Sequence, residues 1–165
     1  MRRITTLPSL SSLVIVAALA AGFATVGQPL LAQDAHHKIV AADDVAFGEG
    51  PPHLPPGIGL VVMAGKPSEP GLYVLRLKFP AGMEIPPHTH PEDEHVTVLS
   101  GGFGIGMGET LDRDAAPMMG PGSFFQMPAN MAHYAWAEEE TVVQLTGTGP
   151  FQINYVNEGD DPRTN

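Results

Sequence analysis

The sequence contains no cysteine and only one tryptophan among its 165 residues. Without cysteine the chain can form neither disulfides nor thiolate zinc sites, so its fold must depend on an apolar core and, where one is bound, a metal. Basic residues are also few, because eight Lys and Arg stand against 18 Asp and Glu, a formal charge of −10. Such an acidic balance repels phosphate backbones, and we expect no nucleic-acid partner.

Long apolar runs are missing except near the N-terminus. Arg2 and Arg3 precede an apolar run over residues 13–26, and the small residue Ala32 follows. This order is typical of a secretory signal peptide, and the run is short for a membrane span. We therefore predict a signal peptide over residues 1–32, cleaved after Ala32, and a periplasmic or secreted protein without a stable membrane span. An uncleaved anchor is the alternative.

Amphipathic stretches of helix length are also lacking, whereas glycine (19) and proline (17) are frequent. Short apolar segments separated by turn formers indicate β-strands. The expected strands are residues 58–63, 72–79, 94–99, 103–107, 123–127, 133–136, 141–146 and 151–156. This pattern predicts an all-β, single-domain closed barrel or jelly roll over residues 57–156. An extended arm over residues 33–56 would precede the barrel, and a polar tail over residues 157–165 would follow it.

Two histidines and a glutamate follow one another at a spacing that suits a metal site. His88 and His90 are two residues apart, so on a strand they face the same side. Glu94 shares their parity, and the turn-like residues 91–93 can bring it back toward them. Glu92 or Asp93 could replace Glu94, or the site could contain histidines alone.

A second segment supplies a further imidazole at the start of another expected strand. His133 follows the turn-forming residues 128–130, so the fold can bring it to His88 and His90 as a fourth ligand beside Glu94. Imidazole and carboxylate ligands together suit divalent first-row metals. A bound metal is therefore the expected centre of function.

With these two motifs the sequence resembles the cupin superfamily, as a small, exported, single-domain, type-2-like member. Gly82, His88, His90, Glu94 and Gly101 match the first motif, and Gly122, Pro128 and His133 match the second. The chain departs from the family pattern at Asn130 and Ala137, although asparagine can adopt the positive φ of the usual glycine. The resemblance covers residues 57–155 and implies a jelly-roll β-barrel and the ligand set His88, His90, Glu94 and His133. It does not imply a reaction.

The proposed metal would be Fe(II) or Mn(II), with Zn, Ni or Cu as alternatives. Four protein ligands leave two positions of an octahedral metal open, which favours catalysis. The leading hypothesis is a dioxygenase-like metalloenzyme acting on a small organic molecule, with Glu94 also able to act as a base. Lyase, isomerase or decarboxylase chemistry is possible with another metal. A non-catalytic small-molecule or metal sensor is the alternative class, and a metal-stabilised scaffold protein is a third.

Aromatic and polar side chains are expected to line the pocket around the metal. The apolar candidates are Phe125, Met127, Tyr134 and Trp136, and the polar candidates for orienting a ligand are Tyr73 and Gln144. His36, His37 and His53 are interpreted as solvated side chains rather than ligands. The arm over residues 33–56 could pair with a second copy, so a homodimer is possible.

Overall fold

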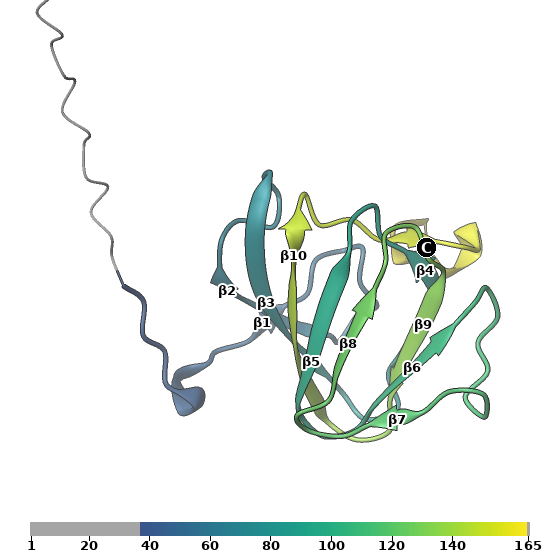
Figure 1. Cartoon of the computed structure of the whole chain (residues 1–165), viewed down its shortest axis with the longest axis horizontal. Helices are drawn as coiled ribbons and strands as arrows, with labels where there is room; N and C mark the ends of the chain where they lie inside the picture. The colour runs from purple at the N-terminus through teal and green to yellow at the C-terminus, as the bar shows by residue number, and fades with distance from the viewer. Residues whose placement is uncertain (1–36, 165) are drawn as a thin grey trace, which may run out of the picture. The chain divides into compact units, whose positions relative to one another are not determined.

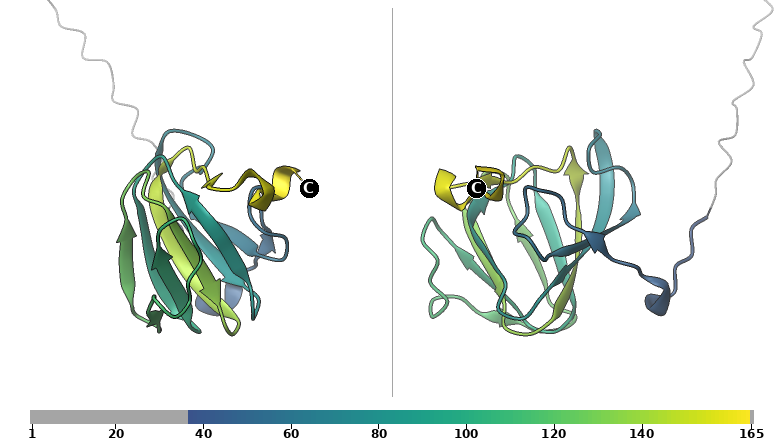
Figure 2. Two further views of the ribbon diagram at one scale, coloured as in Figure 1. Left: turned by 90° about the vertical axis from the view of Figure 1, so that its right-hand side faces the viewer. Right: turned by 180° about the vertical axis from the view of Figure 1, so that it is seen from behind.

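The computed structural model describes residues 37–164, so the predicted signal peptide over residues 1–32 lies outside the described residues. From Ile39 onward the described chain forms one unit built from two antiparallel sheets. Figures 1 and 2 show these sheets as two layers that face each other. The prediction of an all-β fold is confirmed. No helix within residues 37–164 is long and apolar enough to cross a membrane.

The larger sheet has six strands and the smaller sheet has five. In the larger sheet the order is β1 (Gly48–Glu49), β2 (Gly59–Ala64), β3 (Gly71–Phe79), β10 (Thr141–Gly149), β5 (Glu94–Ser100) and β8 (Phe124–Met127). In the smaller sheet it is β11 (Asn154–Tyr155), β4 (Glu84–Thr89), β9 (His133–Ala137), β6 (Phe103–Met107) and β7 (Met118–Met119). Three short 3-10 turns, η1 (Ala42–Asp44), η2 (Glu158–Asp160) and η3 (Pro162–Thr164), lie outside the sheets.

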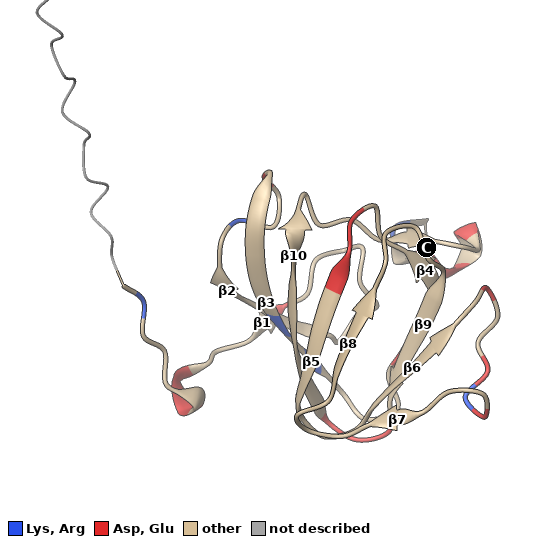
Figure 3. Cartoon of the chain, in the orientation of Figure 1, with Lys and Arg blue, Asp and Glu red and all other residues tan. Residues whose placement is uncertain are grey.

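In the larger sheet the strands form because apolar residues recur at every second position, which gives that sheet one buried face. In β3, Tyr73, Leu75, Leu77 and Phe79 are buried, and the residues between them are only partly buried. These side chains pack into one core with apolar residues of the facing sheet. Figure 3 shows few charged residues along the strands, with acidic residues at the start of β5.

Two turn positions show why the chain reverses where it does. Gly101 has a φ of +75°, and a Cβ there would come within 2.5 Å of the Glu140 carbonyl oxygen. Asn130 adopts a φ of 63°, as expected for an asparagine that replaces the usual glycine of the second motif. Gly101 directly follows β5, and Asn130 lies between β8 and β9.

The expected strand ranges leave out β4, the strand that carries His88. Pro86 and Pro87 lie inside it, and proline is normally confined to strand edges and bulges. The pairing with β9 accommodates them, because its register shifts between Ile85 and His88. Within the range expected for the arm, β1 pairs with β2 and Leu54 is buried in the core. The expected strands also leave out the short β7, and β10 continues to Gly149 beyond the expected range 141–146. In the range 151–156, β11 covers only Asn154–Tyr155.

Candidate metal centre

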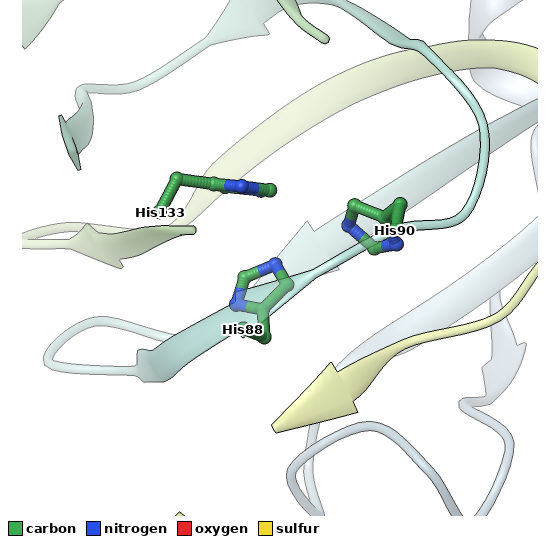
Figure 4. A group of neighbouring side chains, drawn as sticks. All are labelled: His88, His90 and His133. Atoms are coloured by element: carbon green, nitrogen blue, oxygen red, sulfur yellow. The ribbon is translucent and has the colours of Figure 1, made fainter. Parts of the chain in front are cut away.

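Three histidines from two neighbouring strands meet in the interior of the fold. His88 lies in β4 directly opposite His133 of β9, and His90 follows just after β4 ends. Figure 4 shows the three imidazoles gathered between their strands. One nitrogen from each ring lies within 4.8 Å of the others, and all three residues are buried. The structure therefore brings together the three histidines predicted as ligands, in a cluster that could hold a metal ion.

Backbone carbonyls fix the orientation of each ring. Nδ1 of His88 lies 2.7 Å from the Pro86 oxygen, and Nδ1 of His133 lies 3.0 Å from the Met131 oxygen. Nδ1 of His90 lies 2.5 Å from the oxygen of Gln152. Because a carbonyl oxygen only accepts hydrogen bonds, Nδ1 must carry the proton in each ring, and a neutral ring then has its lone pair on Nε2. In this tautomer Nε2 is the nitrogen that can bind a metal.

Glu94, the first residue of β5, supplies a carboxylate beside two of these rings. Its Oε1 lies 3.4 Å from Nε2 of His90, and its Oε2 lies 3.6 Å from Nε2 of His133. In neutral rings with Nδ1 protonated, these nitrogens have no proton to donate to the carboxylate. Nε2 of His90 is in fact buried without a hydrogen-bond partner. A cation placed among these atoms would satisfy both the lone pairs and the negative charge.

The ionisation of the cluster agrees with this donor set. Burial, followed by the charges of His133 and His90, lowers the pKa of His88 to about 3, so its ring is neutral at pH 7. Burial by itself would raise the pKa of Glu94, but attraction to His90 and His133 when these rings carry a positive charge outweighs it and holds that pKa below its ordinary value. The site therefore offers a neutral imidazole and an ionised carboxylate to a divalent metal.

The neighbouring acidic residues do not take the place of Glu94. Both carboxylate oxygens of Asp93 are occupied, by the side-chain amide of Gln126 at 3.0 Å and by the backbone N–H of Ala129 at 2.8 Å. Glu92 is exposed. Of the three acidic residues considered from the sequence, Glu94 is the one that the fold buries against the histidines.

An apolar cavity adjoins the cluster. Besides the histidines and Glu94, its lining includes Ile85, Val96, Ile105, Phe125 and Phe151. The space open to the centre of a water molecule is about 30 Å³, which corresponds to roughly two waters. Apart from the three histidines and Glu94, every residue that lines this cavity is apolar.

The predicted pocket residues divide between the inside and the outside of the fold. Phe125 lines the cavity, and Tyr73 lines a second pocket that shares His90 and Glu94 with it. Met127 is buried in the core opposite Glu94 but does not line the cavity.

The structure corrects the placement of Tyr134, Trp136 and Gln144, which do not line the cavity. Side chains alternate along a strand, so His133 and Ala135 face inward while Tyr134 and Trp136 face outward. Outside, the Tyr134 hydroxyl donates to the Asp112 carbonyl oxygen at 2.8 Å. Gln144 lies between the inward Val143 and Leu145, and its side-chain oxygen accepts a hydrogen bond from Arg76 at 3.2 Å.

Sequence reasoning missed the groups that orient the rings. The carbonyls of Pro86, Met131 and Gln152 gave no signal, because every residue carries a carbonyl and only the fold decides which one an imidazole meets. Pro86 and Met131 each lie two residues before the histidine whose ring they orient. This short spacing is a signal that the sequence does contain.

Comparison with known proteins identifies the fold. A family model described as the ChrR cupin-like domain matches residues 35–152. No curated protein matches the sequence significantly. Among solved structures, KdgF from Halomonas sp. aligns with a TM-score of 0.53 at 23% identity, covering 67% of this chain and 94% of that one.

Two enzymes of different activity share the same architecture. The polyketide cyclase RemF from Streptomyces resistomycificus aligns with a TM-score of 0.60 at 17% identity, covering 78% of this chain and 91% of that one. Salicylate 1,2-dioxygenase from Pseudoaminobacter salicylatoxidans, seen with gentisate, gives 0.54 at 15% identity, covering 66% of this chain and 31% of that one. At such identities the similarity shows the fold alone.

Proposed function

Since this chain belongs to the cupin superfamily, as a ChrR cupin-like domain, we propose that it is an exported metalloenzyme with dioxygenase-like chemistry on a small organic molecule. The observation that carries the proposal is the donor set. The Nδ1 atoms of His88, His90 and His133 are all engaged by carbonyls, which leaves Nε2 for a metal, and Glu94 adds a carboxylate. Fe(II) or Mn(II) is the proposed metal, with Zn, Ni or Cu able to use the same ligands.

The residues around the centre suit such chemistry. A redox-active divalent metal held here would supply Lewis acidity and electron exchange with oxygen. Glu94 is buried and ionised, so its carboxylate can accept a proton from a substrate hydroxyl. Val96, Ile105 and Phe125 form a hydrocarbon wall that limits the space for water beside the reacting groups. The likeness to a cyclase and a dioxygenase shows a shared fold and does not choose between reactions.

Metal analysis of the purified protein, followed by oxygen-uptake assays, tests the proposal. We expect stoichiometric iron or manganese and oxygen consumption with some member of a panel of diols, diketones and phenolics. His90→Ala should lower the metal content and the melting temperature together, because metal bound only by the folded state adds to its stability. His95→Ala is the matched control, since His95 stacks on the exposed Phe124 instead of joining the cluster. Unchanged metal content in His90→Ala would refute the metal centre.

A non-catalytic metal or small-molecule sensor is the second candidate. The observation that favours it is the small free volume of the cavity, which suits a metal and its waters better than a bulky substrate. Tight zinc binding, no oxygen uptake and a ligand-dependent change in solution shape would support the sensor over the enzyme.

Export and dimerisation stay predictions. Protein recovered from a periplasmic or secreted fraction should have the mass of a chain that begins at Gln33, and a mass that includes residues 1–32 would contradict cleavage. Light scattering on the same sample decides between a monomer and a homodimer.

A further inference from the structure

A second pocket lies on the other side of the candidate metal centre. His90, Glu94 and Phe151 line both this pocket and the inner cavity, so these three side chains separate the two spaces. The phenol of Tyr73 lines the second pocket as well, and its ring meets Phe151 edge-on at 5.9 Å between centroids. The second pocket therefore borders the histidine cluster and is lined by the Tyr73 side chain.

The strand register places the Tyr73 hydroxyl near Glu94. Tyr73 of β3 is paired with Gly147 of β10, and Gly147 is paired with Glu94 of β5. Figure 1 shows these strands side by side, with β10 between the other two. All three residues are buried, so the two side chains flank a glycine on the inner face of the sheet.

Gly147 leaves the space that the tyrosine ring fills. A Cβ at position 147 would lie 2.6 Å from the Tyr73 hydroxyl oxygen and 2.9 Å from the ring carbon that carries it. The phenol thus covers the position of a side chain at Gly147. Gly147 is in turn paired with Glu94, the first residue of β5. A glycine is required here because any other residue would push the hydroxyl away.

The Tyr73 hydroxyl is a neutral phenol near pH 7, since the pKa of tyrosine is ordinarily about 10. Burial raises the pKa of Tyr73, and the negative charge of Glu94 raises it further. A neutral phenol donates its proton in a hydrogen bond, and the bond is strongest when the acceptor is an anionic oxygen. Such an anion is tolerated beside the ionised Glu94 only when a cation offsets the repulsion, which is what the proposed metal would do.

We propose that Tyr73 is a ligand-binding residue of this centre, whose hydroxyl donates a hydrogen bond to the anionic oxygen of a small acid, hydroxamate, enolate or phenolate bound there. This inference rests on the proposed metal centre. It narrows the substrate class to small molecules that present an oxygen anion toward β3. It also assigns Gly147 a role, because the glycine makes room for the phenol.

Acetohydroxamate binding to the Co(II)-loaded protein, followed by visible absorption, tests the proposal. We expect Tyr73→Phe to raise the dissociation constant of acetohydroxamate about tenfold, the effect of losing a hydrogen bond to a charged group, while Co(II) affinity stays within about twofold. Gly147→Ala should weaken acetohydroxamate binding similarly, although the phenol is retained. Tyr134→Phe is the matched control and should bind like the wild type, since that hydroxyl bonds the Asp112 carbonyl outside the cavity.

The outcomes separate this inference from the proposed function. Wild-type protein that binds no Co(II) would overturn the metal centre, and this inference with it. Co(II) and acetohydroxamate binding that are both unchanged in Tyr73→Phe would overturn the inference alone. Loss of Co(II) itself in Tyr73→Phe would also overturn it, because Tyr73 would then support the metal site and not the ligand.

Discussion

The inward-facing and outward-facing side chains of β9 differ in size and chemistry, although they alternate along a strand of five residues. The inward face carries His133 and the small Ala135, which line the cavity. The outward face carries Tyr134 and Trp136, both almost fully buried. Each outward ring occupies the space that a Cβ would need on the neighbouring strand β6, where Gly106 lies against Tyr134 and Gly104 against Trp136.

This difference shows how the sheet combines a cavity with good packing. Small residues on the inner face leave space beside the histidines, while the large apolar area is buried on the outer face instead. Burial of that area contributes to folding whether or not a metal is bound. We therefore expect substitutions on the outer face to change the free energy of unfolding and those on the inner face to change metal binding.

Trp136→Ala is expected to have the largest effect on stability. Removing a fully buried tryptophan should lower the free energy of unfolding by about 3–5 kcal/mol, since the cavity left behind cannot fully collapse. Urea denaturation in the presence of a chelator measures this change. The fraction that stays folded should still bind metal with the wild-type stoichiometry. Lost metal binding in the folded variant would show that the two faces are not independent.

Gly106→Ala tests the neighbouring contact on the same face, between β6 and Tyr134. Its Cβ would collide with the ring of Tyr134, so we expect overpacking to lower the free energy of unfolding by about 1–3 kcal/mol. Gly120→Ala is the matched control, because nothing lies within 4 Å of the position its Cβ would occupy. Equal stability of the two variants would contradict the close packing of β6 on β9.

The same strand shows what the sequence could and could not predict. The spacing of His88 and His90, the position of His133 at a strand start and the resemblance to the cupin motifs together predicted that the three rings meet. Tyr134 and Trp136 were wrongly placed in the pocket, even though alternation puts them opposite His133 once that histidine is taken as a ligand. The prolines of β4 concealed the strand that carries His88, because a bulge tolerates residues that sequence rules exclude from strands.

The pH dependence of stability tests the inner face. In metal-free protein the pKa of His88 is lowered from 6.5 to about 3, so below pH 6.5 the unfolded state binds a proton that the folded state does not. Stability should therefore be complete above pH 6.5 and fall by up to about 1.4 kcal/mol per pH unit as the pH decreases toward 5. Urea denaturation at each pH, with a chelator present, measures the slope. His88→Asn should flatten it and His95→Asn should not; an equal slope in both variants would contradict the shift.

Tyr134→Phe should have the smallest effect, and it compares two adjacent residues of one strand. The variant loses only the hydrogen bond from the hydroxyl to the Asp112 carbonyl, so the free energy of unfolding should fall by about 0.5–1.5 kcal/mol. Metal affinity, measured by competition with a chelator, should not change. His133→Ala, one residue earlier, should have the opposite pattern: metal affinity should be lost. The free energy of unfolding of the metal-free variant should fall less than in Trp136→Ala. Reduced metal affinity in Tyr134→Phe would mean that the outer aromatic layer helps to hold the histidines in place.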